Sequence, residues 1–148
     1  MIAITGATGF IGSHLVRRLT EINRPVKTLA RIPPQNDLAP SKRLNRVVGD
    51  IRDSSARQRL LTHCSVLVHL ANVYQNRVSG IAEMIAVNET ASIRLLSEAA
   101  RTGVRRIVYL STAGVHTHTG GIADESTPLR LHSKDPYERQ KILSLIHI

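Results

Sequence analysis

Tyr137 and Lys141 are four residues apart in the sequence Tyr-Glu-Arg-Gln-Lys. On a helix, residues at this spacing share one face, so a phenol and an ammonium group would lie side by side. A free tyrosine has a pKa of about 10 and is a poor base at neutral pH, but a neighbouring cation favours the phenolate. The pair could therefore exchange a proton with a hydroxyl or carbonyl group. An ordinary pair on a surface helix is the alternative interpretation.

Three glycines spaced three apart follow a short apolar run at the start of the chain. Gly6, Gly9 and Gly12 lie between residues 2–4, which are typical of a strand, and an amphipathic segment from Ser13 to Asn23. A glycine turn brings backbone N–H groups close to an anion, and a helix N-terminus adds a positive end. The pattern predicts a binding site for a dinucleotide pyrophosphate. A glycine-rich turn into a helix, without a ligand, is the alternative.

The ends of the next two predicted strands bear on the cofactor. Residues 26–30 complete a strand–helix–strand unit and lead into Arg31, where a carboxylate would bind the adenine-ribose 2′-hydroxyl. A guanidinium can instead bind a 2′-phosphate, which favours NADP over NAD; an ordinary exposed arginine is the alternative. Asp50 ends the third predicted strand, residues 46–50, and is expected either to meet the adenine amino group or to cap the next helix.

Strands and helices alternate along the rest of the chain. After a Pro-rich loop at 32–40, the patterns predict a helix, a buried strand, a long helix ended by Gly103, and a fifth strand, at 54–62, 66–71, 81–102 and 106–110. This alternation predicts an α/β fold in one domain, with a doubly wound parallel sheet of the Rossmann type.

Two polar residues interrupt the apolar patterns of these elements. His69 lies inside the buried strand and is expected to be a hydrogen-bonded core histidine rather than a ligand. Asn88 lies in the apolar stripe of the long helix and is expected to hold the neighbouring strand end by hydrogen bonds. The predicted stripe consists of Met84, Ile85, Asn88, Ala91, Ser92, Leu95, Leu96 and Ala99.

Composition restricts the classes of partner. The 148 residues carry a formal net charge of +9, but the basic residues are scattered and aromatic residues make up only 3%, so we do not expect nucleic-acid binding. The single Cys64 excludes an intrachain disulfide and a cysteine-cluster metal site, and we expect no metal. No apolar run reaches the length of a membrane span and no leader precedes the first strand, so we expect no membrane association and a cytoplasmic location.

These motifs together resemble the extended short-chain dehydrogenase/reductase superfamily, in its NAD(P)-dependent epimerase/dehydratase-like family. The family's glycine motif is matched by residues 5–12 (Thr-Gly-Ala-Thr-Gly-Phe-Ile-Gly), and its fourth-strand signature by residues 69–71 (His-Leu-Ala). Its fifth-strand Ser/Thr motif is similar to residues 109–115 (Tyr-Leu-Ser-Thr-Ala-Gly-Val). The tyrosine and lysine described above follow in the usual order, and the resemblance extends to about Ile142.

Two positions depart from the family pattern. Asn72 stands where alanine is usual, and His116 stands where a tyrosine is often found. The second departure weakens the case for a sugar-nucleotide substrate.

The resemblance implies a mechanism and a set of site residues. Hydride would pass between a substrate carbon and nicotinamide C4, with Tyr137 as the acid/base. Lys141 would lower the tyrosine pKa and orient the nicotinamide ribose, and Thr112 would hydrogen-bond the reacting oxygen. The implied cofactor-binding residues are Gly6, Thr8, Gly9, Phe10, Ile11, Gly12, Arg31, Asp50, Ile51, Leu70, Ala71, Asn72 and Lys141.

Three functions are compatible with these motifs. The first is an NADP-preferring oxidoreductase acting on a small-molecule substrate. The second is an NAD-dependent nucleotide-sugar epimerase or dehydratase. The third is a non-catalytic dinucleotide-sensing regulatory protein, which the joint presence of Thr112, Tyr137 and Lys141 argues against because sensing needs only the glycine turn. A homodimer of the full-length protein is compatible with the resemblance.

The C-terminal end of the sequence is unusual for the family. Its members continue well past the position of Lys141, so we expect the chain to be an inactive N-terminal fragment with a sheet incomplete at its C-terminal side and no substrate-binding part. Residues 143–148 lack the polar face expected of this helix. They also translate CTG TCT CTT ATA CAC ATC, a transposon-end adapter of sequencing libraries. We therefore expect residues 1–142 to form the native dinucleotide-binding domain and the last six residues to be a non-native tail.

Overall fold

The parallel sheet has the order of a doubly wound fold. The computed structural model describes residues 1–32, 42–74, 80–117 and 120–146. Within these ranges five strands pair in the order β3-β2-β1-β4-β5, and every pairing is parallel. The strands are β1 (Ile2–Thr5), β2 (Val26–Ala30), β3 (Leu44–Val48), β4 (Val66–His69) and β5 (Arg106–Tyr109). The chain thus runs from β1 to one edge and then crosses back to β4, as the sequence predicts.

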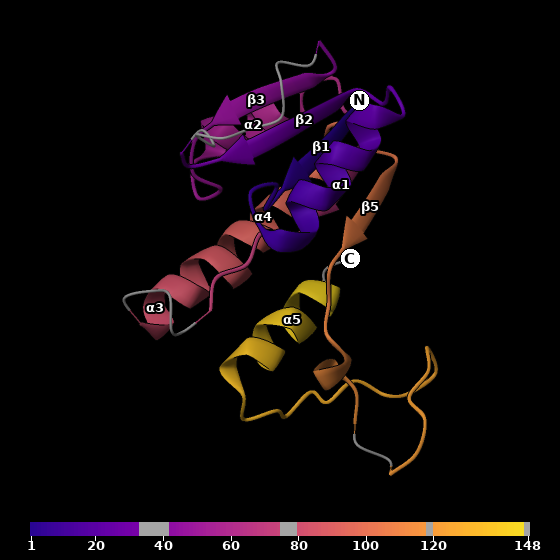
Figure 1. Ribbon diagram of the computed structural model, residues 1–148. Coiled ribbons are helices and arrows are strands. Elements are labelled where there is room, and N and C mark those ends of the chain that lie inside the picture. The colour runs from indigo at the N-terminus through magenta and orange to yellow at the C-terminus, as the bar shows by residue number, and fades with distance from the viewer. Residues whose placement is uncertain (33–41, 75–79, 118–119, 147–148) are drawn as a thin grey trace.

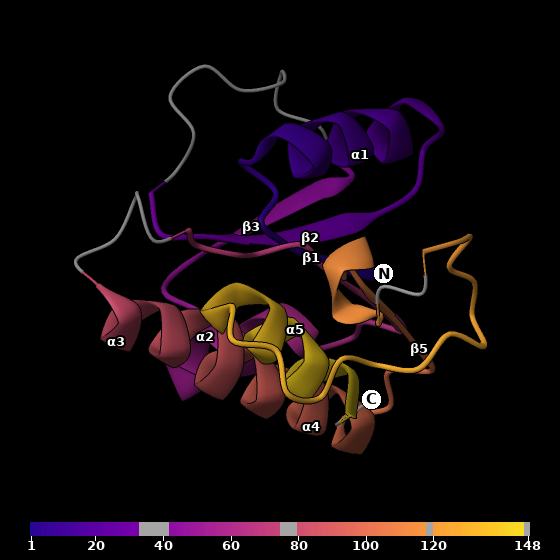
Figure 2. The same cartoon turned by 90° about the horizontal axis from the view of Figure 1, so that it is seen from below.

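Helices cover both faces of this sheet (Figures 1 and 2). α1 (Phe10–Glu21) lies on one face, and the remaining α-helices lie on the other side in Figure 2. These are α2 (Ser54–Leu61), a long helix made of α3 (Ile81–Met84), η2 (Ile85–Ala91) and α4 (Ser92–Arg101), and α5 (Pro136–Ile146). A single 3-10 turn, η3 (Ala113–Val115), follows β5.

The core has two parts because strand side chains alternate between the faces. Ala3 of β1 joins the larger cluster, which packs the sheet against Leu60 of α2 and Leu95 of α4. Ile4, the next residue, joins the smaller cluster with Val16 of α1. The inner strands β1 and β2 are therefore buried on both sides, and the carboxyl ends of the strands are the place where loops can form a site.

The long helix departs from the predicted pattern in its middle. Residues 85–91 are π-helical, and the Ser92 hydroxyl donates to the Val87 carbonyl at 3.1 Å. A π turn holds more residues than an α turn, so it rotates the residues before it relative to those after it. Val87 is buried and Ile85 is 40% exposed, so the prediction that Ile85 belongs to the buried stripe is wrong. The other predicted members of the stripe are buried.

The predicted elements are all present, with shifted ends. β3 begins and ends two residues earlier than predicted, so Asp50 follows the strand instead of ending it. α1 begins at Phe10, directly after the glycine turn, and Asn23, at φ +57°, ends it as expected. The Pro-rich loop lies almost entirely outside the described residues. No helix in the described ranges is both long and apolar enough to span a membrane.

Candidate functional site

The glycine turn is packed too closely to accept side chains. Gly6 has φ +69°, and a Cβ atom there would lie 2.7 Å from the backbone nitrogen of Ala71, which follows β4. A Cβ on Gly12 would lie 2.1 Å from the Gly6 carbonyl oxygen. The turn therefore holds the N-terminus of α1 against the ends of β1 and β4.

The first turn of α1 can bind an anion through its backbone N–H groups rather than through its side chains. Phe10 and Ile11 are 83% and 50% exposed, so their side chains point to solvent. The N–H groups of a first helical turn have no carbonyl partner within the helix, and they attract anions. Phe10, Ile11 and Gly12 can therefore contribute N–H groups at the place where the sequence predicts a pyrophosphate.

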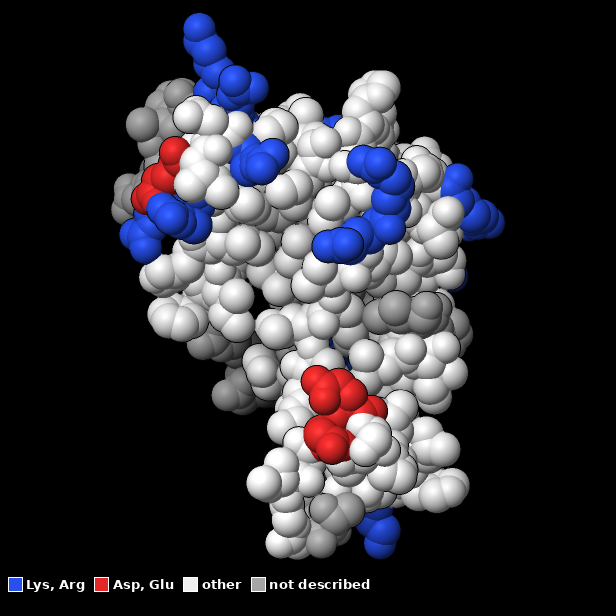
Figure 3. All heavy atoms as spheres, turned by 90° about the vertical axis from the view of Figure 1, so that its right-hand side faces the viewer, with Lys and Arg blue, Asp and Glu red and all other residues white. Residues whose placement is uncertain are grey.

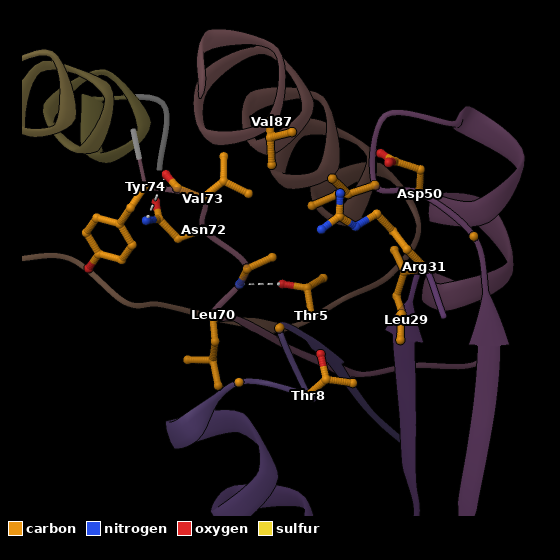
Figure 4. Close-up of a pocket in the computed structure, with 16 residues that line it drawn as sticks. Thr5, Thr8, Leu29, Arg31, Asp50, Leu70, Asn72, Val73, Tyr74 and Val87 are labelled. Atoms are coloured by element: carbon orange, nitrogen blue, oxygen red, sulfur yellow. Dashed lines mark hydrogen bonds between the residues drawn. The ribbon is translucent and has the colours of Figure 1, made fainter. Parts of the chain in front are cut away.

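A cavity of about 730 Å³ lies over the carboxyl ends of β1, β2, β3 and β4. Its size falls within the range of small-molecule sites, roughly 300 to 1,000 Å³. Figure 4 shows Arg31 and Asp50 toward one side and Asn72 and Tyr74 toward the other. The lining residues are Thr5, Gly6, Thr8, Gly9, Leu29, Ala30, Arg31, Gly49, Asp50, Ile51, Leu70, Ala71, Asn72, Val73, Tyr74 and Val87. Most of the predicted cofactor-binding residues are thus brought together, whereas Phe10, Ile11, Gly12 and Lys141 are outside this lining.

Asp50 is held by an arginine that the sequence did not single out. Its carboxylate accepts from the Arg52 backbone nitrogen at 2.8 Å and from the Arg52 guanidinium at 2.9 and 2.8 Å. These bonds lower the pKa of Asp50, and Arg31 adds a smaller electrostatic contribution. The N-cap of α2 is Asp53, so the cap interpretation of Asp50 is wrong. A contact between Asp50 and adenine stays a prediction.

The loop after Asp50 is anchored by Arg57, which sequence reasoning missed. Arg57 is 2% exposed and donates to the carbonyl oxygens of Ile51 and Arg52 at 2.9 and 2.8 Å. Its guanidinium also binds both carboxylate oxygens of Glu98, at 3.0 and 2.7 Å. This buried pair ties the loop after β3, which lines the cavity, to α4. An arginine on a short polar helix gives no sequence signal for such a role.

His69 is a core histidine, as predicted. Its Nδ1 is 2.6 Å from the Thr5 hydroxyl, and its Nε2 is 2.8 Å from the Ser92 hydroxyl. Burial lowers the pKa of His69 to about 3, with a smaller contribution from the charge of Lys141. The Thr5 hydroxyl also accepts from the Ala71 N–H at 3.2 Å, so this network fixes the strand end beside the glycine turn.

Asn88 holds the segment after the neighbouring strand by hydrogen bonds, as predicted, and is also bonded to α5. Its Oδ1 accepts from the Val73 N–H at 2.9 Å, and its Nδ2 donates to the Val73 carbonyl at 2.8 Å. The same Nδ2 is 3.1 Å from Gln140 Oε1 on α5. One buried amide therefore connects the cavity wall after β4 to the helix that carries Tyr137.

The start of α5 places Tyr137 and Lys141 on one face. Asp135 Oδ1 accepts from the N–H groups of Tyr137 and Glu138 at 2.8 and 3.0 Å, and Pro136 is the first helical residue. This is the arrangement favoured at a helix N-terminus. The Lys141 Nζ lies 5.7 Å from the centroid of the Tyr137 ring.

Lys141 is a buried cation packed between β5 and α5. It is 4% exposed, donates to the Leu110 carbonyl at 2.9 Å, and its Nζ lies 4.6 Å from the centre of the Tyr109 ring. Burial lowers its pKa to about 8. The carbonyl and the electron-rich ring face are the groups that stabilise its charge.

Tyr137 contacts a second tyrosine that no motif indicated. Its ring centroid is 5.2 Å from that of Tyr74, with 31° between the ring planes. Burial is the largest of the causes that raise the pKa of Tyr137 well above its usual range. The lowering of this pKa by Lys141, which the family resemblance implies, stays a prediction.

Thr112 follows β5 and begins the η3 turn. Its hydroxyl oxygen accepts from the Gly114 N–H at 3.4 Å, and η3 packs against α5. Thr112, Tyr137 and Lys141 are outside the lining of the cavity, and Tyr74 is the lining residue that touches Tyr137.

Two buried polar atoms have no hydrogen-bond partner among the described residues. They are the Oδ1 of Asn72 and the hydroxyl of Ser111. Asn72 lines the cavity, so its carbonyl oxygen can accept a hydrogen bond from a ligand. Such a bond would remove the free-energy cost of a buried acceptor that has no partner. The described residues contain no group of three or more His, Cys, Asp or Glu side chains placed to bind a metal.

The charge distribution was the basis for expecting no nucleic-acid partner. On the face shown in Figure 3, lysine and arginine side chains lie in several separate groups, one of them beside an acidic side chain, and other acidic side chains form a patch lower down. A basic stripe of the kind that follows a nucleic-acid backbone is not seen on that face.

Comparison with known proteins gives the same class of fold. A model of the NAD-dependent epimerase/dehydratase family matches residues 2–146. The chain is 35% identical over 145 residues to sterol demethylase protein B of Methylococcus capsulatus, which covers 95% of the chain and 44% of that protein. It is 32% identical over 112 residues to ceramide reductase of Caulobacter vibrioides, which covers 76% of the chain and 34% of that protein.

Solved structures agree with these sequence matches. A short-chain dehydrogenase/reductase superfamily protein from Agrobacterium tumefaciens, with bound NAD, aligns with a TM-score of 0.85 at 27% identity, over 99% of the chain and 43% of that protein. The dTDP-glucose 4,6-dehydratase DesIV of Streptomyces venezuelae, also with NAD, aligns at 0.82 and 30% identity, over 99% and 49%. The chain thus spans less than half the length of these relatives. Because the family model covers nearly every residue, the chain belongs to the NAD-dependent epimerase/dehydratase family, within the extended short-chain dehydrogenases/reductases.

Proposed function

We propose that the chain binds NADP(H), and that the full-length protein transfers hydride between this cofactor and a hydroxyl or carbonyl group of a small molecule. The observation that carries the proposal is the cavity itself. It begins beside Arg31 and Asp50, passes the glycine turn, and ends at Tyr74, which touches Tyr137. The relatives support the reaction class, since one is named as a reductase and two neighbours hold NAD.

The residues present fit a dinucleotide. The glycine turn keeps its tight path because a Cβ at Gly6 or Gly12 would collide with backbone atoms of the chain. The unpaired Asn72 oxygen borders the same cavity. We assign the pyrophosphate to the N–H groups of Phe10, Ile11 and Gly12, and a 2′-phosphate to Arg31. The remaining proposed contacts are Thr8, Asp50, Ile51, Leu70, Ala71 and Asn72 along the cavity and Lys141 toward the nicotinamide ribose. The bound nicotinamide would supply or accept the hydride.

The proposed proton chemistry depends on three side chains of this chain. A neutral Tyr137 can donate its proton to a carbonyl oxygen as that oxygen becomes an alcohol. In the reverse direction Tyr137 must first have lost its own proton, and its phenolate then accepts the proton of the substrate hydroxyl. A nearby positive charge such as the Lys141 ammonium favours the phenolate. Thr112 would orient the reacting oxygen with its hydroxyl.

Replacing Tyr137 tests the catalytic part of the proposal. In the full-length protein, Tyr137→Phe should reduce kcat by at least about 100-fold, because it removes the only proton donor assigned to the substrate oxygen. NADPH binding should remain within about twofold, since the ring is kept and Tyr137 does not line the cavity. An equally active Phe variant would contradict the mechanism, and a full-length wild type that binds NADPH but shows no turnover of any carbonyl substrate would favour the sensor.

Replacing Arg31 tests the choice of cofactor. Arg31→Ala should weaken NADPH binding about 10- to 100-fold, the range of one lost charge-assisted contact, and leave NADH binding nearly unchanged. Binding is followed by nicotinamide fluorescence, and Arg101→Ala, an exposed arginine at the end of α4, is the matched control. Tighter binding of NADH than NADPH to the wild type would contradict the assignment of Arg31.

Tighter binding of NADH than of NADPH would favour the second candidate, an NAD-dependent nucleotide-sugar epimerase or dehydratase. The observation in its favour is that solved neighbours at 28% and 30% identity contain NAD with UDP-glucose, or are dTDP-glucose dehydratases. Turnover of UDP-glucose or dTDP-glucose by the full-length protein, without net consumption of NAD, would distinguish it from a reductase.

A further inference from the structure

Arg31 and Asp50 carry opposite charges at the same end of the cavity. β2 and β3 are neighbours, and the Gly49 N–H donates to the Ala30 carbonyl at 3.0 Å, so the residues that follow the two strands stay side by side. Both Arg31 and Asp50 line the cavity, and Figure 4 shows them on the same side of it. A guanidinium and a carboxylate placed in this way would be expected to form an ion pair with each other.

The structure shows a different pairing. Both carboxylate oxygens of Asp50 accept from the Arg52 guanidinium, at 2.9 and 2.8 Å, and Oδ1 also accepts from the Arg52 N–H at 2.8 Å. Arg31 acts on Asp50 through its charge alone. Within the part of the chain that the structure describes, Arg31 makes no hydrogen bond or ion pair, so its guanidinium lines the cavity without a carboxylate partner.

The backbone of the loop that carries Arg52 is fixed. The Asp53 N–H donates to the Asp50 carbonyl at 3.0 Å, which closes a turn around Arg52. The buried Arg57 guanidinium donates to the carbonyl oxygens of Ile51 and Arg52, and is itself held by a carboxylate of α4. The pair is therefore local to one fixed turn, which gives Arg52 an advantage over a partner that must reach Asp50 from another strand.

We propose that Arg52 is a positioning residue that sets the choice of cofactor: it holds the Asp50 carboxylate and so leaves the Arg31 guanidinium available for the 2′-phosphate of NADP(H). The identity of the ligand rests on the proposed function. A phosphate monoester carries about two negative charges at neutral pH, and it binds a guanidinium most strongly where no carboxylate competes. An Asp50 carboxylate released from Arg52 would both occupy Arg31 and repel the phosphate.

Two small ligands isolate the effect of the 2′-phosphate. Adenosine 2′,5′-bisphosphate and adenosine 5′-monophosphate differ only in that group, so the ratio of their dissociation constants removes the contribution of every shared contact. In titration calorimetry of the chain, Arg52→Met should lower the preference for the bisphosphate about 10-fold, because a charge-assisted contact is lost. Arg101→Met, at the exposed end of α4, is the matched control and should keep the wild-type preference. An unchanged preference in Arg52→Met would overturn the proposal.

A second substitution separates positioning from direct binding of the phosphate by Arg52. In Asp50→Asn/Arg52→Met no carboxylate is left at this position to occupy Arg31, so the preference for the bisphosphate should return to within about threefold of the wild type. Loss of a contact between Asp50 and adenine would affect both ligands equally and would not change the ratio. A preference that stays low in the double variant would overturn the proposal, since Arg52 would then be binding the phosphate itself.

A measurement without nucleotide tests the pairing alone. The Nε–H resonance of Arg31, assigned with Arg31→Lys, is followed in proton–nitrogen spectra at slightly acidic pH, where its exchange with water is slow. It should change position in Arg52→Met, as Asp50 moves to Arg31, and return in the double variant; equal spectra would overturn the proposal. A wild type that binds both ligands equally would instead contradict the proposed function, with the Arg31 resonance still deciding whether Arg52 keeps Asp50 from Arg31.

Discussion

At the scale of single residues, His69 shows how one buried polar group can make the free energy of unfolding depend on pH. Both of its ring nitrogens are used, by Thr5 and Ser92, and its pKa is lowered to about 3 by burial. In the unfolded chain a histidine has a pKa of about 6.5, so between these values the unfolded state binds a proton that the folded state does not. Stability contributed by neutral His69 is therefore complete above about pH 6.5 and is lost as the pH falls toward 3.

Replacement of this histidine should flatten that dependence. The wild type should lose up to about 1.4 kcal/mol of unfolding free energy per pH unit through His69 below about pH 6.5. His69→Gln should be less stable at neutral pH, because its hydrogen bonds are altered, but should have a shallower slope. Urea unfolding at several pH values measures both slopes, with the exposed His132→Gln as control. An equal slope in His69→Gln and the wild type would contradict this role.

Residue types and spacing indicated the residues that line the cavity more fully than the contacts around Tyr137. The glycine turn, Arg31, Asp50 and residues 70–72 could be predicted because each lies at the carboxyl end of a strand that the sequence also predicts. Tyr74 could not, because its contact with Tyr137 depends on α5 returning to β4 across 63 residues of sequence (137 − 74). Arg57 was missed for a similar reason, since its partner Glu98 lies on another helix.

At the scale of elements, the apolar runs were sufficient to predict all five strands of the described sheet and their parallel arrangement. The ends were less well predicted, because strand pairing decides them: β3 pairs with β2 from Leu44 to Val48, whereas its apolar run suggested residues 46–50. The π turn at residues 85–91 could not be predicted from a 3.6-residue period.

Two polar residues at this turn also bear on the site. Asn88 and Ser92 share the buried face of the long helix, where Asn88 holds Val73 and Ser92 is hydrogen-bonded to His69. Because Asn88 is also bonded to Gln140, this part of the long helix connects the wall of the cavity to α5.

At the scale of the whole molecule, the cavity connects elements from both halves of the sheet. Its lining comes from the ends of β1, β2, β3 and β4 and from the buried face of the long helix. A ligand that contacts all of them is bound by the folded state only. Dinucleotide binding should therefore stabilise the described fold as one cooperative unit.

We expect NADPH at about 100 times its dissociation constant to stabilise the chain by about 2.7 kcal/mol, which corresponds to a rise in Tm of about 5 to 10 °C for a chain of this size. Circular dichroism should show a single transition that moves as a whole, because the ligand spans both sides of the sheet. In Arg31→Ala the rise should be smaller at the same NADPH concentration, and nicotinamide mononucleotide, which lacks the adenosine, should give a smaller rise in the wild type. Two separate transitions, or an equal rise with the mononucleotide, would show that the ends of the cavity are not bound by one ligand.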